Sequence, residues 1–407
     1  LDDLHRVAPD SPLGLLEGLI ERLPAQWSVL LSSRVLPALP LARWRAAGEL
    51  VLFGQDQLAF SADEAAALAA AEGAQARAAE LFQRTRGWPA GLRLLLTAPQ
   101  RAGSRLALDR DVSDFLASEV LDEMPAALHD FLLRVAVLPE MTAARAAAVS
   151  GDARASDWFD EIERRGLFVT VLDAHERTLV LHDLFRDALL DRLRRRWPEQ
   201  EAPLLRRAAE SERDPVRRVG FLLRAHDWPR AEAALAQAAP DLLLAGGIRE
   251  LQRLIDAFDA TWRESSPRLQ RLAGMASTLR WAWEPMARHM QAAQVAARRL
   301  GDQVELDLAE AYLAGALYPL DQNADGEALI AGLKARPLAA DARRLTLMAD
   351  CSQHLRRGQM GELPALYGEL LDLLEPQTHL LAWWECVPPF NWTTVPGMQP
   401  LLERYVQ

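Results

Sequence analysis

The spacing of apolar positions divides the chain into a short α/β start and a long helical remainder. Residues 27–33 form a short apolar run that ends in hydroxyl side chains, as a strand buried on both faces of a parallel sheet does. Helical spacing precedes this run between Ser11 and Leu23, and residues 49–53 are a second strand candidate. The pattern predicts an α/β segment at residues 1–60, with Leu1 as the end of a first strand.

The next two segments change to helical periodicity. Ser61-Ala62-Asp63-Glu64 resembles a capping box, and alanine-rich helices follow up to Arg86. Gly87-Trp88-Pro89 interrupts them, a further helix follows from Ala90, and residues 99–111 look like an exposed linker.

Residues 112–200 have the order of elements of a winged helix. Helices are predicted at 112–121, 125–136 and 156–165, with Gly166 as a C-cap. Two strands follow at 167–172 and 178–182, and a helix at 183–196 closes the segment.

Residues 204–375 read as helices of roughly 12–16 residues, with breaks about every 17–20 residues. Paired helices of that period predict a tetratricopeptide-like (TPR-like) α-solenoid. The breaks are expected at 227–229, 246–247, 265–267, 284–285, 301–302 and 358. The tryptophan- and proline-rich tail at 382–397 is either a capping segment or an irregular insert.

Composition narrows the function classes. The 407 residues include 46 basic and 57 acidic side chains, a net charge of -11, which argues against a generic nucleic-acid binder. Cys351 and Cys386 form no CxxC motif, so a disulfide framework or zinc site is not expected and a cytoplasmic location fits. Asp2 and Asp3 precede any apolar run, and no stretch approaches the length of a membrane span, so neither a signal peptide nor a membrane contact is expected.

Four short polar motifs follow one another in an order that resembles a known family. They are Asp2-Asp3, the run from Leu30 to Arg34, Gly87-Trp88-Pro89, and the run from Leu181 to Arg186. Their order is similar to that of the STAND class of signalling ATPases, and within it to the MalT-type transcriptional regulators, relatives of the LuxR family. The motifs cover about residues 1–190, and the resemblance continues to 407 by repeat pattern alone.

The resemblance implies a mainly α fold with four parts. These are the end of a P-loop α/β ATPase module (1–60), a helical module (61–111), a winged helix (112–200) and a TPR-like sensor arm (201–407). The phosphate-binding motif G-x-x-x-x-G-K-[ST] does not occur, since Lys334 is the one lysine of the chain, and no helix-turn-helix is recognisable after residue 380. We therefore expect a fragment of a longer regulator that is inactive as an ATPase alone.

The resemblance also assigns roles to individual residues. Adjacent carboxylates repel, so one of them needs a cation or a proton; by resemblance Asp2 holds Mg²⁺ and Asp3 is the catalytic residue that orients water. The nucleotide-binding residues are Arg34 at the terminal phosphate, Gly87 and Pro89 on the adenine side, and His182 at the β-phosphate of ADP. Each motif also has an ordinary interpretation: a solvated acidic pair, a surface arginine, a helix start, a core histidine.

The implied function is a switch in which ADP holds the resting state, while ATP and an inducer favour an active oligomer. A small-molecule inducer or a protein would bind the arm, and DNA would be contacted through a domain outside this chain. Two alternatives stay open: a TPR-like scaffold for protein interactions, or an NTPase module fused to a different effector.

Overall fold

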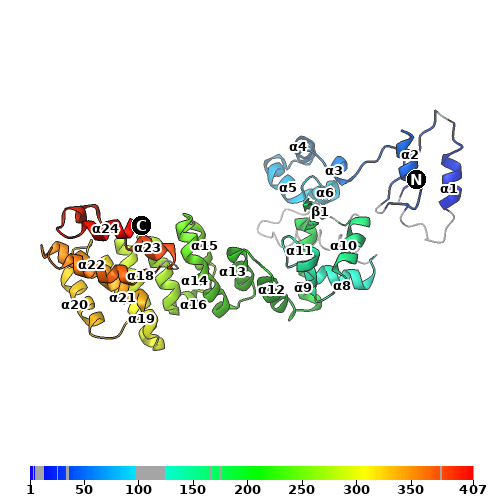
Figure 1. The fold of residues 1–407 in the computed structure, drawn as a ribbon. Helices are drawn as coiled ribbons and strands as arrows, with labels where there is room; N and C mark the ends of the chain where they lie inside the picture. Colours follow the sequence, from blue (N-terminus) through cyan, green and yellow to red (C-terminus); the bar gives the residue numbers. More distant parts are fainter. Residues whose placement is uncertain are drawn as a thin grey trace. The chain divides into compact units, whose positions relative to one another are not determined.

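The computed structural model describes residues 1–2, 4, 13–24, 26–33, 36–97, 124–165, 167, 169–173, 177–375 and 378–406. Contacts group the chain into two compact units, Leu1–Ser211 and Glu212–Gln407. Both units are mainly helical, as predicted (Figure 1). None of the described helices is long and apolar enough to cross a bilayer. The finer domain boundaries at residues 60, 111 and 200 stay predictions.

The N-terminal segment contains three short helices, α1 (Leu13–Ile20), α2 (Leu41–Ala46) and α3 (Gln55–Leu58). Leu1 runs parallel to residues 30–32: its amino group donates to the Leu30 carbonyl at 2.9 Å, and the Ser32 amide donates to the Leu1 carbonyl at 3.0 Å. This ladder is too short to form a regular strand at 27–33. The second predicted strand, at residues 49–53, is wrong, since these residues join no sheet within the described part of the chain.

The helical module comprises α4 (Ala62–Ala71), the 3-10 turn η2 (Gln75–Arg77), α5 (Ala78–Thr85) and α6 (Pro89–Thr97). The predicted capping box is confirmed: the Glu64 amide donates to the Ser61 hydroxyl at 3.3 Å, and the Ser61 amide donates to the Glu64 carboxylate at 2.8 Å. The predicted linker at 99–111 lies outside the described residues.

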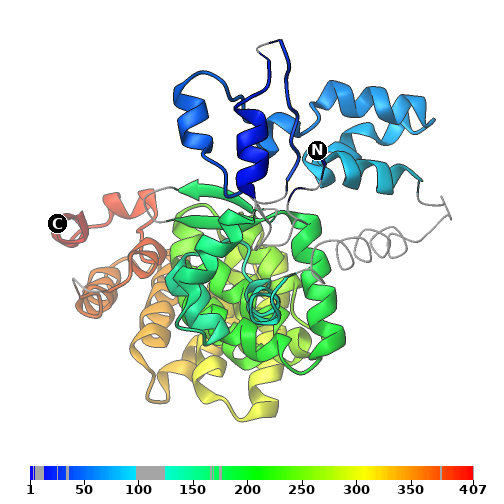
Figure 2. The same ribbon diagram turned by 90° about the vertical axis from the view of Figure 1, so that its right-hand side faces the viewer.

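The winged-helix region consists of α8 (Ala126–Val135), α9 (Ala143–Ser150), α10 (Ala155–Arg164), β1 (Val169–Asp173), β2 (Thr178–Leu181), α11 (Asp183–Arg196) and α12 (Glu201–Glu210). The two strands form an antiparallel hairpin in which Val169 lies opposite Leu181 (Figure 2). The hairpin and the helices predicted at 125–136, 156–165 and 183–196 are confirmed. Helix α9 was missed, and the helix at 112–121 and the cap at Gly166 lie outside the described residues.

The second unit is a succession of helices that pack on their neighbours in sequence, α17 on α18, α18 on α19 and α19 on both α20 and α21 (Figure 1). The helices are α13 (Pro215–Arg224), α14 (Trp228–Leu244), α15 (Ile248–Asp256), α16 (Ala260–Ser265), α17 (Pro267–Thr278), α18 (Trp283–Leu300), α19 (Gln303–Leu317), α20 (Asn323–Lys334), α21 (Ala340–Arg356), α22 (Leu363–Asp372), α23 (Leu380–Glu385) and α24 (Gln399–Val406), with the 3-10 turn η4 (Phe390–Thr394) before α24. The order of paired helices agrees with the predicted TPR-like stack.

Several turns of this stack share one backbone geometry. A residue with positive φ follows the first helix: His226 (φ 53°), Trp281 (φ 56°) and Asp321 (φ 60°). The next amide then donates five residues back, from 282 to 277 at 3.1 Å and from 322 to 317 at 3.0 Å, as in a Schellman cap. The predicted break at 284–285 is wrong, because a proline is tolerated in the first turn of a helix and α18 already begins at Trp283.

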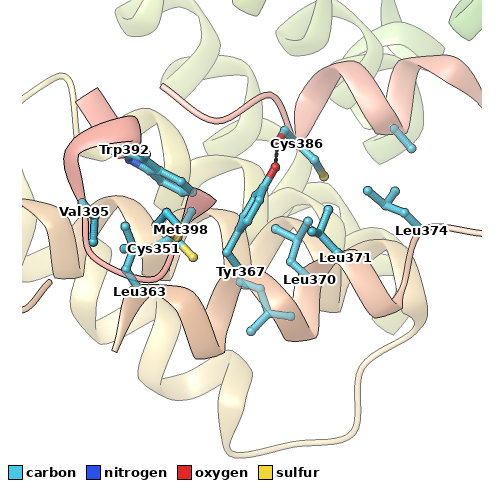
Figure 3. Packing of buried hydrophobic residues seen from close by; sticks show 12 residues of the cluster. Cys351, Leu363, Tyr367, Leu370, Leu371, Leu374, Cys386, Trp392, Val395 and Met398 are labelled. Atoms are coloured by element: carbon cyan, nitrogen blue, oxygen red, sulfur yellow. Dashed lines mark hydrogen bonds between the residues drawn. The ribbon is translucent and has the colours of Figure 1, made fainter. Parts of the chain in front are cut away.

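The C-terminal tail is a capping segment rather than an irregular insert. Trp392, Val395 and Met398 pack with Tyr367 in one buried apolar cluster (Figure 3). The Tyr367 hydroxyl donates to the Cys386 carbonyl at 3.1 Å. Both cysteines are free and buried.

Candidate functional site

The turn at Gly87 has a geometry that only glycine can adopt without strain. Its φ is +79°, and a β-carbon there would lie 2.2 Å from the carbonyl oxygen of Phe60. The Phe60 amide donates to the Gly87 carbonyl at 2.8 Å, which holds the two segments together. Pro89 then begins α6, where its fixed φ suits the first helical turn. The local sequence therefore builds a tight turn whose backbone packs closely against the backbone of Phe60.

His182 connects this turn to the winged-helix region. It is the N-cap of α11, and its Nδ1 accepts a hydrogen bond from the Leu184 amide at 3.3 Å. Its Nε2 lies 2.9 Å from the Thr85 carbonyl, at the last residue of α5. A carbonyl can only accept, so the proton must be on Nε2, and Nδ1 must be bare to accept from the amide. His182 is thus a buried, neutral histidine with both ring nitrogens engaged.

Two charged side chains lie close to the contact between His182 and Thr85 but are not part of it. Burial lowers the pKa of His182, and the nearby Arg86 acts in the same direction, while the hydrogen bond to Thr85 and the Asp183 carboxylate oppose it. Arg86 pairs with Asp183 at 3.1 Å, from the helical module to the start of α11. Both partners are largely solvated, at 49% and 42% exposed, so the pair adds orientation more than stability. The Trp88 ring stands edge-on to the imidazole, with ring centroids 6.4 Å apart.

Asp2 lies beside the end of the run that contains Ser32. The Ser32 hydroxyl donates to an Asp2 carboxylate oxygen in a short hydrogen bond. A carboxylate and a hydroxyl are oxygen donors of the kind that Mg²⁺ uses together with substrate phosphates. They would form only part of a coordination shell, and no group of three potential metal-ligating side chains occurs among the described residues.

The structure brings together only some of the predicted site residues. It places Gly87 and Pro89 in the turn that follows Thr85, the residue that His182 contacts. Asp2 lies beside Ser32, and Asp3 and Arg34 lie outside the described residues. Sequence analysis missed Thr85, Arg86 and Phe60. The only signal was their position next to the motifs or, for Phe60, just before the capping box.

A cavity of about 500 Å³ also opens in the winged-helix region, lined by Arg134, Ser150, Gly151, Trp197, Gln200, Leu204 and Arg207. Its two arginines donate to carbonyls at the end of α9: Arg134 to Ser150 at 3.4 Å and Arg207 to Val149 at 3.2 Å. These contacts satisfy a helix C-terminus. A structural role therefore accounts for the presence of both arginines in this cavity.

Comparison with known proteins agrees with these observations. Residues 117–201 match the family described as the MalT winged helix domain. The HTH-type transcriptional regulator MalT of Yersinia pestis is 30% identical over 223 residues, which is 51% of this chain and 24% of that protein. MalT of Yersinia enterocolitica matches with the same identity and coverage. The chain thus spans about a quarter of the length of these relatives.

A solved structure shares the fold. It is the STAND protein with a tetratricopeptide repeat sensor from Pyrococcus horikoshii, with a TM-score of 0.57 and 12% sequence identity. The match covers 86% of this chain and 54% of that one. The winged-helix match and the MalT relatives confirm the resemblance to MalT-type regulators, and the Pyrococcus structure shows a shared fold.

Proposed function

We propose that this chain is the regulatory and sensor part of a nucleotide-controlled transcription regulator. The observation that carries the proposal is the contact between His182 and Thr85, two residues before the Gly87–Pro89 turn. In the family that the chain resembles, this turn faces adenine and this histidine faces phosphate. The resemblance of the chain to proteins named HTH-type transcriptional regulators supports transcription as the output of the proposed switch.

The switch would depend on one proton. Neutral His182 has a single N–H, on Nε2, and in this structure the Thr85 carbonyl accepts it at 2.9 Å. A phosphate oxygen of ADP would have to replace that carbonyl, so the imidazole cannot serve both acceptors at once. Since an ionised acceptor makes a stronger hydrogen bond than a neutral one, bound ADP would hold the winged helix more firmly. ATP would favour the released form only if it binds that form better.

The other predicted residues complete the proposed pocket. Asp2, with the Ser32 hydroxyl beside it, would hold Mg²⁺, which neutralises phosphate charge when it is bound with the nucleotide. Asp3 would orient water and Arg34 would contact the terminal phosphate. The phosphate-binding loop would come from a part of the protein outside this chain.

The helical arm would supply the input signal. We propose that residues 201–407 bind a small-molecule inducer or a protein, and that binding favours the open state and self-association. DNA would be contacted by a separate domain, consistent with the net charge of -11. The TPR sensor of the Pyrococcus structure supports this assignment of the arm.

The test is transcriptional output of the complete protein without inducer. His182→Asn keeps a good N-cap residue but cannot reach the Thr85 carbonyl or a phosphate. A lost hydrogen bond to a charged group costs about 1.5–3 kcal/mol, so basal output should rise roughly tenfold. His226→Asn is a matched control, because Asn tolerates the positive φ of that turn. Unchanged output from a folded His182→Asn protein would refute the proposal.

A further inference from the structure

We propose that the second unit carries a carboxylate-binding site that the chain's own Glu385 occupies, and that the ligand of the arm bears a carboxylate that replaces Glu385. This inference rests on the proposed sensor role of residues 201–407 and names the ligand class. It also assigns the Glu385 carboxylate, at the end of α23, as the group that the ligand displaces.

Three helices that are distant in sequence converge on this carboxylate. One oxygen of Glu385 accepts from the Tyr312 hydroxyl of α19, and the other accepts from Nη2 of Arg344 in α21 at 3.0 Å. Tyr312 and Arg344 are buried, and only 11% of the Glu385 side chain is exposed. The other acid near Arg344 is Asp341, which is 3.5 Å away and 71% exposed. Glu385 is therefore the buried counterion of Arg344.

The chemistry of the site selects a single carboxylate. Arg271 is already neutralised by Glu305, which it contacts at 2.7 and 3.1 Å. Burial raises the pKa of Tyr312, so its hydroxyl stays a neutral donor. Burial is the largest single influence and would lower the pKa of Arg344, but the Glu385 carboxylate together with Cys386 and Tyr312 outweighs it, so the pKa is raised. Once Glu385 is displaced, the buried Arg344 cation and two separate donors, from Arg344 and Tyr312, match one negative charge spread over two oxygens.

Helix α23 is short and partly exposed, although Leu381 and Ala382 on it are buried and the Tyr405 hydroxyl donates to the Trp383 carbonyl at 2.7 Å. It has six residues, too few for a helix to be stable alone, and Leu380 and Trp384 on it are 70% and 41% exposed. Its contact with α14 includes an exposed hydrogen bond from His379 to Asp241 at 2.8 Å.

The segment after α23 shares a buried cluster with Ala382 and is held by further contacts of its own. The Cys386 carbonyl accepts from Tyr367, and the fully buried Trp392 packs against that ring (Figure 3). Displacing Glu385 would therefore loosen the C-terminal end of α23 and leave the capping segment tethered in place.

Tethering makes Glu385 a strong competitor. An intramolecular group acts at an effective concentration in the millimolar range or above, so a simple carboxylate cannot displace it from the unaltered chain. An inducer would need further contacts in the arm to succeed. Removing the Glu385 carboxylate, in contrast, should leave a site that a free carboxylate fills.

The experiment is chemical rescue of the 407-residue chain by acetate. Glu385→Ala should lower the melting temperature, because it leaves Arg344 buried without its counterion. At about 100 mM sodium acetate and a dissociation constant of about 10 mM, the melting temperature should recover by roughly 3–6 °C relative to equal sodium chloride. The unaltered chain should show no such shift.

Two controls isolate the site. Glu369→Ala breaks the exposed pair of Glu369 with Arg343, the neighbour of Arg344 on α21, and should show no rescue. The double variant Arg344→Met with Glu385→Ala removes the buried cation together with its carboxylate partner. Acetate should therefore not raise the melting temperature of this variant. Equal rescue in either control, or no rescue of Glu385→Ala, would overturn the proposal. A Glu385→Ala chain that stays unfolded even in acetate would overturn it too.

The rescue requires no nucleotide and no transcriptional readout. Its failure would leave the His182 switch untouched, and failure of the reporter test would leave the carboxylate site untouched.

Discussion

Two different replacements of His182 should separate the contributions of its two hydrogen bonds to stability. His182→Ala removes both the N-cap of α11 and the bond to the Thr85 carbonyl, whereas His182→Asn removes only the second. Loss of an N-cap costs about 0.5–2 kcal/mol, and loss of a neutral hydrogen bond about 0.5–1.5 kcal/mol. The Thr85 carbonyl keeps a second donor, the Trp88 amide at 2.8 Å, so it is not left unsatisfied and the lower half of the range applies to that bond.

The assay is amide hydrogen exchange on the 407-residue chain. His182→Asn should speed exchange at the end of α5 and in the Gly87 turn by roughly 2–5-fold, while the Leu184 amide stays protected. His182→Ala should speed exchange at both places, because Leu184 also loses its acceptor. If His182→Asn exchanges like the unaltered chain at α5, the bond to Thr85 contributes nothing and the interface account fails.

Three further predictions test the same region. Because burial lowers the pKa of His182, its neutral contacts stabilise fully above the ordinary value of 6.5 and are lost as pH falls below it. The protection factor at α5, which compares the exchange rate with the intrinsic rate at the same pH, should therefore fall between about pH 7 and 5 in the unaltered chain but not in His182→Asn. Gly87→Ala should lower the free energy of unfolding, measured in urea, by about 2–4 kcal/mol, because the new β-carbon would clash with the Phe60 carbonyl. Gly73 also has a positive φ but open space around it, so Gly73→Ala should lower the same free energy by about 1 kcal/mol. Equal losses in the two variants would contradict the contact at Phe60. Calorimetric titration with ATP and Mg²⁺ should show weak binding or none, since the chain contains no phosphate-binding loop, and a dissociation constant below about 1 μM would contradict this.

Local patterns made much of the fold predictable. The capping box at Ser61 and the two strands of the hairpin are encoded within a few residues, and both are confirmed. Helix α9 was missed because its run of alanines has little apolar contrast. The break before α18 was misplaced because the turn uses Trp281, a residue without a turn signal, in a positive-φ position.

The candidate site was predictable only as separate motifs. Gly87, Pro89 and His182 were found by resemblance, and the structure adds that the turn and the histidine meet at Thr85. That contact spans 97 residues, and no local pattern encodes it. The pairing of Tyr312 with Glu385, 73 residues apart, was inaccessible for the same reason.

The central claim is that nucleotide controls the docking of the winged helix on the helical module through His182. The most direct measurement is hydrogen exchange of residues 78–88 and 178–186 in the complete protein, with ADP and Mg²⁺ or with ATP and Mg²⁺. Stronger protection of both segments in ADP, abolished by His182→Asn, is the expected result. Identical protection in the two nucleotides, or a difference that survives His182→Asn, would contradict the account.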